Sequence, residues 1–144
     1  MLLKNNAQVL VRVETASKAE LEKLFGPQEP VEGKVVGALY NADISGVKNA
    51  LLHSNPAGLV AGLKILCILT GAQAAALIVN CPVSEQELQA NAGSIKLPLE
   101  IIQADLVDVR AHEKDRLVPF DVLAALSAQL IGDTPGVLLS VDAD

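Results

Sequence analysis

Residues 55–81 read NPAGLVAGLKILCILTGAQAAALIVNC and contain one helix signal followed by one strand signal. Asn55 before Pro56 marks a helix start, because asparagine caps free backbone amides and proline suits the first helical position. The apolar run that follows ends at Gly71, a residue that favours helix termination. Residues 75–81 are then apolar nearly throughout, which is typical of a strand covered on both faces. The stretch therefore predicts a helix leading directly into a buried strand.

A membrane-spanning helix is the alternative for the apolar part of this stretch, residues 57–79. Lys64 lies in its middle, and Gly71-Ala72-Gln73 divides it into two unlike halves, of which the second is strand-like. A charge at the centre of a membrane helix is costly. The first six residues lack the basic region and long apolar stretch of a signal peptide. We therefore expect no membrane insertion and a cytoplasmic protein.

Strands and helices alternate on both sides of this stretch. Capping boxes, in which a serine and a glutamate satisfy each other's free amides, occur at 17–20 and 84–87. The alternation predicts a single α/β domain over 1–144, with a three-layer α/β/α arrangement and a Rossmann-like parallel or mixed sheet. The expected strands are 8–13, 34–40, 75–81, 99–104 and 136–141, with 106–109 extending the fourth or standing alone. One expected helix follows each of the two capping boxes. Three further helices are expected over 47–52, 55–71 and 119–131.

The two halves of the chain resemble each other. Residues 9–26 lie over 76–93 with a strand, a short link, a capping box and a glycine at matching places. An internal duplication of a βα unit, covering 8–71 and 75–132, would explain this likeness. Two unrelated βα units that obey the same capping rules would explain it equally well.

Composition excludes several classes of protein. The 144 residues are 51% hydrophobic and 19% charged, typical of a folded domain, and the net charge is −6. An acidic chain with only 2% aromatic residues lacks what nucleic-acid binding requires. Cys67 and Cys81 lie in or at the end of apolar runs, so we interpret them as small buried side chains in a reducing compartment. Two cysteines are too few for an iron–sulfur cluster.

The exit of the strand at 34–40 is the most informative place for a binding site. Ligands of open α/β sheets bind outside the carboxyl ends of the strands. Asn41 offers a donor and an acceptor, Asp43 a carboxylate and Ser45 a hydroxyl, which suits a ribityl chain or ribose. The alternative is an Asx-type turn that caps the next helix. The charged run 110–116, around His112, is interpreted as a solvated loop.

From Val35 to about Pro82, a third of the chain, the sequence resembles the flavin-bearing, NADH-binding subunit of respiratory complex I and its relatives in hydrogenases and formate dehydrogenases. In that family a strand ends in Asn-Ala-Asp-Glu-Ser, followed by a helix of the form Asp-Pro-His-x-Leu-x-Glu-Gly. Asn41-Ala42-Asp43 and Ser45 match the first motif, and Pro56, Leu59 and Gly62 match the second. The resemblance implies the fold of the FMN-binding domain, with Asn41, Asp43 and Ser45 contacting the flavin.

Several family residues are replaced in this chain. Ile44 stands for the glutamate of the first motif, and Ala57 and Ala61 stand for the histidine and glutamate of the second. The glycine-rich loop that cradles flavin phosphate is absent, and residues 120–123 do not match the Gly-Glu-Glu that helps bind NADH. The resemblance therefore implies that FMN is a possible cofactor, that NAD is a less favoured one, and that no iron–sulfur cluster is bound. It does not imply that this chain has the family's NADH dehydrogenase activity.

Two functions follow as hypotheses. The chain is either a flavin- or nucleotide-binding electron-transfer component that works with redox partner subunits, or a degenerate, non-catalytic copy of the fold that serves as an assembly module. The missing motifs favour the second, as does a mean hydropathy of +0.38, which suggests surface buried in a homo-oligomer or against a partner. Whether the 41–45 loop faces an open pocket or a packed interface discriminates between them.

Overall fold

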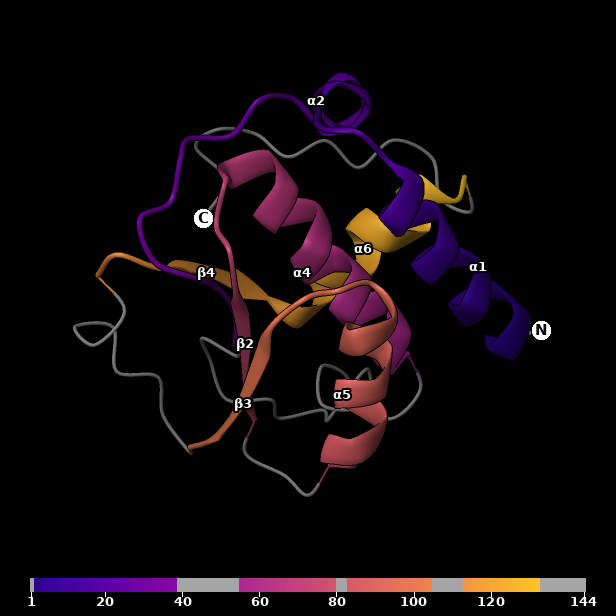
Figure 1. Ribbon diagram of the computed structural model, residues 1–144, viewed down its shortest axis with the longest axis vertical. Helices are drawn as coiled ribbons and strands as arrows, with labels where there is room; N and C mark the ends of the chain where they lie inside the picture. The colour runs from indigo at the N-terminus through magenta and orange to yellow at the C-terminus, as the bar shows by residue number, and fades with distance from the viewer. Residues whose placement is uncertain (1, 39–54, 80–82, 105–112, 133–144) are drawn as a thin grey trace.

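The computed structural model describes residues 2–38, 55–79, 83–104 and 113–132 (Figure 1). Four parallel strands form one sheet in the order β3-β2-β1-β4. They are β1 (Val35–Ala38), β2 (Ala75–Val79), β3 (Leu99–Gln103) and β4 (Arg116–Pro119). Helices alternate with these strands, so the predicted α/β class with a parallel sheet is confirmed.

The five described helices are α1 (Leu2–Thr15), α2 (Lys18–Phe25), α4 (Pro56–Thr70), α5 (Glu85–Ser94) and α6 (Phe120–Leu130). Of these, α4, α5 and α6 pack against one face of the sheet, whereas α1 and α2 pack on other helices (Figure 1). The central helix is α4, which contacts all four of the others. Of its 15 residues 13 are buried, as expected of a helix that is apolar on every side. No helix in the described ranges is long and apolar enough to cross a membrane.

Both faces of the two central strands are buried, which for β2 confirms the prediction from the apolar run. Val35 and Leu77 face the helices, and Val36 and Ala76 face the opposite side, where they are also inaccessible to solvent. In the described residues, most large apolar side chains therefore lie in the interior of the fold. Among the residues with described exposure, the only large hydrophobic side chain that is mostly exposed is Val11, at 65%.

The helix that was expected over 55–71 is confirmed at both ends. The backbone N–H of Gly58 donates to the side-chain oxygen of Asn55 over 3.1 Å, and Pro56 is the first residue of α4. Gly71 ends the helix with a φ of 78°, a left-handed conformation that favours glycine. The helix expected over 119–131 is confirmed as α6, and the strand expected over 99–104 as β3. The elements expected over 47–52, 106–109 and 136–141 lie outside the described residues.

The strand expected over 8–13 was wrong, because these residues belong to α1. The sequence QVLVRV fits the period of a strand and that of a helix. A strand would place Val9, Val11 and Val13 on one face, whereas a helix places Val9 and Val13 one turn apart. The structure buries Val9 and Val13 and leaves Val11 exposed, so packing against the other helices overrides the β-propensity of valine. The compared stretches 9–26 and 76–93 therefore begin with a helix and a strand, and their likeness is limited to the capping boxes and the helices that follow them.

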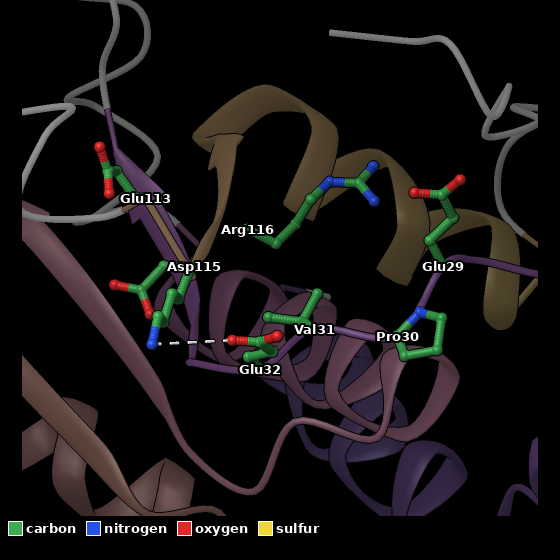
Figure 2. Close-up of a pocket in the computed structure, with 8 residues that line it drawn as sticks. Glu29, Pro30, Val31, Glu32, Glu113, Asp115 and Arg116 are labelled. Atoms are coloured by element: carbon green, nitrogen blue, oxygen red, sulfur yellow. Dashed lines mark ion pairs between the residues drawn. The ribbon is translucent and has the colours of Figure 1, made fainter.

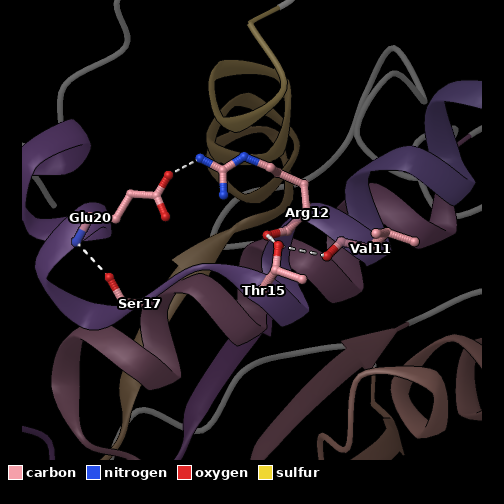
Figure 3. Close-up of polar contacts among 5 residues, drawn as sticks. All are labelled: Val11, Arg12, Thr15, Ser17 and Glu20. Carbon is pink, nitrogen blue, oxygen red and sulfur yellow. Dashed lines mark hydrogen bonds and ion pairs between the residues drawn. The ribbon is translucent and has the colours of Figure 1, made fainter.

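Both serines of the capping boxes act as predicted. The hydroxyl of Ser17 accepts a hydrogen bond from the N–H of Glu20, and that of Ser84 from the N–H of Glu87, each over 3.2 Å. The carboxylate of Glu20 also pairs with Arg12, which joins α2 to α1 (Figure 3). Hydrogen bonding to the Arg12 guanidinium lowers the pKa of Glu20 from its usual value.

Replacing the cap of α5 is expected to cost stability. Ser84→Ala removes the acceptor for the Glu87 N–H and should lower the free energy of unfolding by about 1 kcal/mol. Ser84→Asp keeps an acceptor and adds negative charge at a helix N-terminus, so it should stay within about 0.5 kcal/mol of the parent. Urea unfolding of the three proteins is the measurement, and equal loss in both variants would contradict this role of the hydroxyl.

The interpretation of 110–116 as a solvated loop was wrong for its last residue. Arg116 opens β4, which pairs in parallel with β1 from Val35 to Ala38. The strand is only four residues long and ends at Pro119, which the sequence marks more strongly as a helix start. Proline can stand there because β4 is at one side of the described sheet.

Candidate functional site

The predicted site residues Asn41, Asp43 and Ser45 follow the carboxyl end of β1 but lie outside the described residues. The surrounding fold is described up to Ala38, the last residue of β1. Along the chain β1 leads through α4 to β2 on one side, whereas β4, on its other side, comes later in sequence. The strand order therefore reverses between β1 and β4, and such a reversal is where ligands of open α/β sheets bind.

Three described helices begin at this carboxyl edge, and α4 and α6 are the two beside the reversal; α5 follows β2. α4 connects the parallel strands β1 and β2, so it begins where β1 ends. α6 begins at the residue after β4. Helix N-termini carry partial positive charge, which favours anionic groups nearby. The first turn of α4 carries no acidic residue, whereas that of α6 carries Asp121. The N-terminus of α4 is therefore the end whose charge is not compensated by its own first turn.

Close packing fixes these two helices to each other. A Cβ added at Gly62 of α4 would lie 2.5 Å from the carbonyl oxygen of Leu123 in α6, so the backbones touch at this crossing. One turn earlier, the buried hydroxyl of Ser127 donates to the carbonyl oxygen of Gly58. The glycine that matched the flavin-subunit motif thus has a packing role that holds the N-terminal half of α4 against α6.

The side chains that end β1 and β2 and that begin α6 are apolar. Ala38 ends β1, Val79 ends β2 and Phe120 begins α6, and all three are buried. They are inaccessible to solvent, so they belong to the core beneath this edge and cannot recognise polar groups. Recognition of a ribityl chain or of ribose at this edge would therefore depend on residues such as Asn41 and Asp43.

A second candidate site is a pocket of about 470 Å³ at the opposite, amino-terminal edge of the sheet (Figure 2). It lies between the lead-in to β1 and the start of β4. The two segments are joined by backbone bonds from Gly33 N–H to Lys114 and from Arg116 N–H to Lys34, both 2.8 Å long. The pocket is lined by Glu29, Pro30, Val31, Glu32, Glu113, Lys114, Asp115 and Arg116.

Sequence reasoning missed this pocket because its two walls are about eighty residues apart in the chain. The carboxylate of Asp115 accepts a 2.7 Å hydrogen bond from the backbone N–H of Lys34, and a Cβ at Gly33 would clash with the same carboxylate. The Asp115 carboxylate can occupy this position only because residue 33 has no side chain. An alignment of related sequences could reveal such a pair, but a single sequence cannot.

Cys67 is buried, as predicted, on the last turn of α4. Its thiol lies 3.6 Å from the carbonyl oxygen of Ala74, and burial raises its pKa to about 11. A thiol that stays protonated at neutral pH is a poor nucleophile. His53, Cys81 and His112 lie outside the described residues. In the part of the chain that is described, no three His, Cys, Asp or Glu side chains are grouped to hold a metal ion.

The raised pKa of Cys67 predicts a loss of stability at alkaline pH. The unfolded chain releases this proton near pH 8.5, whereas the folded chain keeps it until about pH 11. The contribution is therefore fully present below the unfolded pKa and is lost as the pH rises through this window. Cys67→Ala should flatten the fall in unfolding free energy between pH 8.5 and 10, measured by urea titration. An equally steep fall in the variant would contradict the assignment.

Comparisons with known proteins give a likeness of fold. No protein-family model matches the chain, and no curated protein sequence matches it. A chain of the NAD+-reducing [NiFe]-hydrogenase in its air-oxidized state superposes with a TM-score of 0.55 and 14% identity, over 88% of this chain. The hydrogenase in its H2-reduced state gives a TM-score of 0.50 and 15% identity over the same share.

The two proteins share a fold. At this identity the likeness carries no more than that, and our chain spans 30% of the length of the hydrogenase chain. The likeness agrees in kind with the resemblance seen in the sequence, which included hydrogenase subunits. It extends well beyond the third of the chain in which the sequence motifs were found.

Proposed function

We infer that this chain is a flavin-binding redox component in which the loop after β1 contacts FMN through Asn41, Asp43 and Ser45. The observation that supports this most is the fold likeness to a chain of an NAD+-reducing hydrogenase over 88% of the chain. The motif Asn-Ala-Asp-x-Ser directly follows the strand at which the sheet order reverses. Fold and motif therefore point to the same edge of the sheet.

One described feature at this edge suits a phosphate-bearing ligand. The N-terminus of α4 carries no acidic residue in its first turn and favours a phosphate group. Asn41 would donate to and accept from ribityl hydroxyls, and Asp43 would accept from them. A bound flavin would supply the electron-carrying chemistry.

A non-catalytic assembly module is the second candidate, and one sequence observation favours it. The glycine-rich loop that cradles flavin phosphate in the resembling family is absent from the chain. The other argument for it, an apolar excess that needs a partner, is weakened because the described apolar side chains are used in the core. An assembly module would leave FMN unbound and would associate with itself or with a redox subunit.

Flavin binding is tested directly on the purified chain. We expect a visible flavin absorbance band as purified, or saturable quenching of FMN fluorescence with a Kd in the micromolar range, about −8 kcal/mol. Adenosine monophosphate serves as the control ligand, since it shares the phosphate of FMN but lacks the isoalloxazine ring and the ribityl chain. A colourless protein that leaves FMN fluorescence unchanged would contradict the flavin proposal. Sedimentation of the same sample would then test the assembly alternative.

A further inference from the structure

The pocket at the amino-terminal edge contains an arginine that is held in place by an amide and not by an acid. Arg116, half-buried at the start of β4, donates to the side-chain oxygen of Gln28 over 3.2 Å. Among the residues that the structure describes, no carboxylate pairs with this guanidinium. A guanidinium has five N–H donors, so most of its hydrogen-bonding capacity is unused by described partners.

Gln28 supports this arrangement at a cost. Its oxygen accepts from Arg116, but its amide nitrogen is buried without a partner. A buried donor without an acceptor destabilises the fold, and such groups in native proteins call for an explanation. An apolar side chain at this position would avoid the cost. Gln28 is therefore best explained by what it does for Arg116, which is to fix the direction of the guanidinium.

The charges of the remaining walls define what can bind beside Arg116. Figure 2 shows the Arg116 head group and the Glu29 carboxylate on one side of the pocket, and Glu32, Asp115 and Glu113 away from them. Glu32 lies 3.9 Å from the ammonium of Lys114, and Asp115 is bonded to the backbone of Lys34. The lining holds four carboxylates and two cationic side chains, so its net negative charge disfavours a simple anion. Beside the guanidinium of Arg116, a simple cation is disfavoured.

We propose that this pocket binds a small organic carboxylate that also carries a cationic group. The carboxylate pairs with Arg116, since the planar guanidinium matches carboxylate geometry with two parallel hydrogen bonds. The cationic group lies toward the exposed carboxylate of Glu29, which is on the same side of the pocket as the Arg116 head group. A volume of about 470 Å³ is within the range of small-molecule sites. The site is independent of the flavin proposal, because it lies at the other edge of the sheet.

A matched set of three probes tests the proposal: γ-aminobutyrate, butyrate and n-butylammonium, each titrated at the same ionic strength. The readout is the NMR signal of the Arg116 Nε–H group in the full, 15N-labelled chain. We expect γ-aminobutyrate to shift this signal saturably, and butyrate and butylammonium to bind about tenfold more weakly or not at all. Equal binding by either single-charge probe, or no saturable shift with γ-aminobutyrate, would overturn the proposal.

Two variants separate binding from folding. Arg116→Gln should weaken γ-aminobutyrate binding by about tenfold or more, read from the backbone amide signals, whereas Arg12→Gln, which removes a surface arginine on α1, should leave binding unchanged. Gln28→Met should weaken binding while leaving thermal stability equal or raised, because it removes the unpaired buried nitrogen. Unchanged binding in Arg116→Gln, or a loss of stability without a loss of binding in Gln28→Met, would refute the assigned roles.

Discussion

Gly62→Ala is expected to lower the free energy of unfolding by about 2 kcal/mol. The new methyl group would lie 2.5 Å from the Leu123 carbonyl oxygen and 2.8 Å from its Cα, which are backbone atoms that cannot rotate away. The two helices would have to separate, and this would loosen the bond between Ser127 and Gly58 one turn away. Overpacking of about 3 kcal/mol outweighs the gain of about 1 kcal/mol that alanine brings to a helix interior.

Gly93→Ala is the matched control for this prediction. Gly93 also lies in a helix, α5, but an added Cβ there meets no atom within 4 Å. The same substitution should therefore raise the free energy of unfolding by about 0.5 kcal/mol through helix propensity alone. Urea unfolding followed by circular dichroism gives both values. A Gly62→Ala protein as stable as the Gly93→Ala protein would show that the α4–α6 crossing is less tight than described.

Local signals in the sequence located most of the described elements. Asn55-Pro56 and Gly71 set the ends of α4, and the serines of the two capping boxes set the starts of α2 and α5 through bonds to backbone three residues away. These features can be predicted because cap and helix are neighbours in the chain. The apolar run at 75–79 predicted a strand buried on both faces. This was also a local signal, because a strand without polar residues on either face is typical of one covered on both sides.

Features that depend on distant contacts could not be predicted in the same way. Val9 to Val13 fit a strand and a helix equally, and only packing against other helices decides between them. The strand β4 is four residues long and is defined by pairing with β1, about eighty residues earlier. The pocket around Arg116 depends on the same pairing. For the candidate flavin site, sequence predicted the residues and the structure describes only the edge of the sheet that precedes them.

The double variant Asn41→Ala/Asp43→Ala is expected to abolish measurable FMN binding. If both side chains bond to ribityl hydroxyls, their removal deletes at least two hydrogen bonds, one of them to a charged group, and should weaken the affinity by about a hundredfold. Fluorescence quenching of FMN is the measurement, with parent and variant compared at equal thermal stability. Asn91→Ala/Glu14→Ala, which likewise removes one amide and one carboxylate side chain, on α5 and α1, is the control and should bind as the parent does.

The single variants of this pair separate the flavin site from the Asx-turn alternative. A residue that only caps the next helix acts on stability, because its side chain bonds to the backbone and never to the ligand. Asp43→Asn keeps an oxygen acceptor for a cap but removes the negative charge. It should therefore leave thermal stability nearly unchanged while weakening FMN binding several-fold. If Asp43→Asn and Asn41→Ala change stability in step with affinity, the loop acts through folding, and the assembly module becomes the better account of this chain.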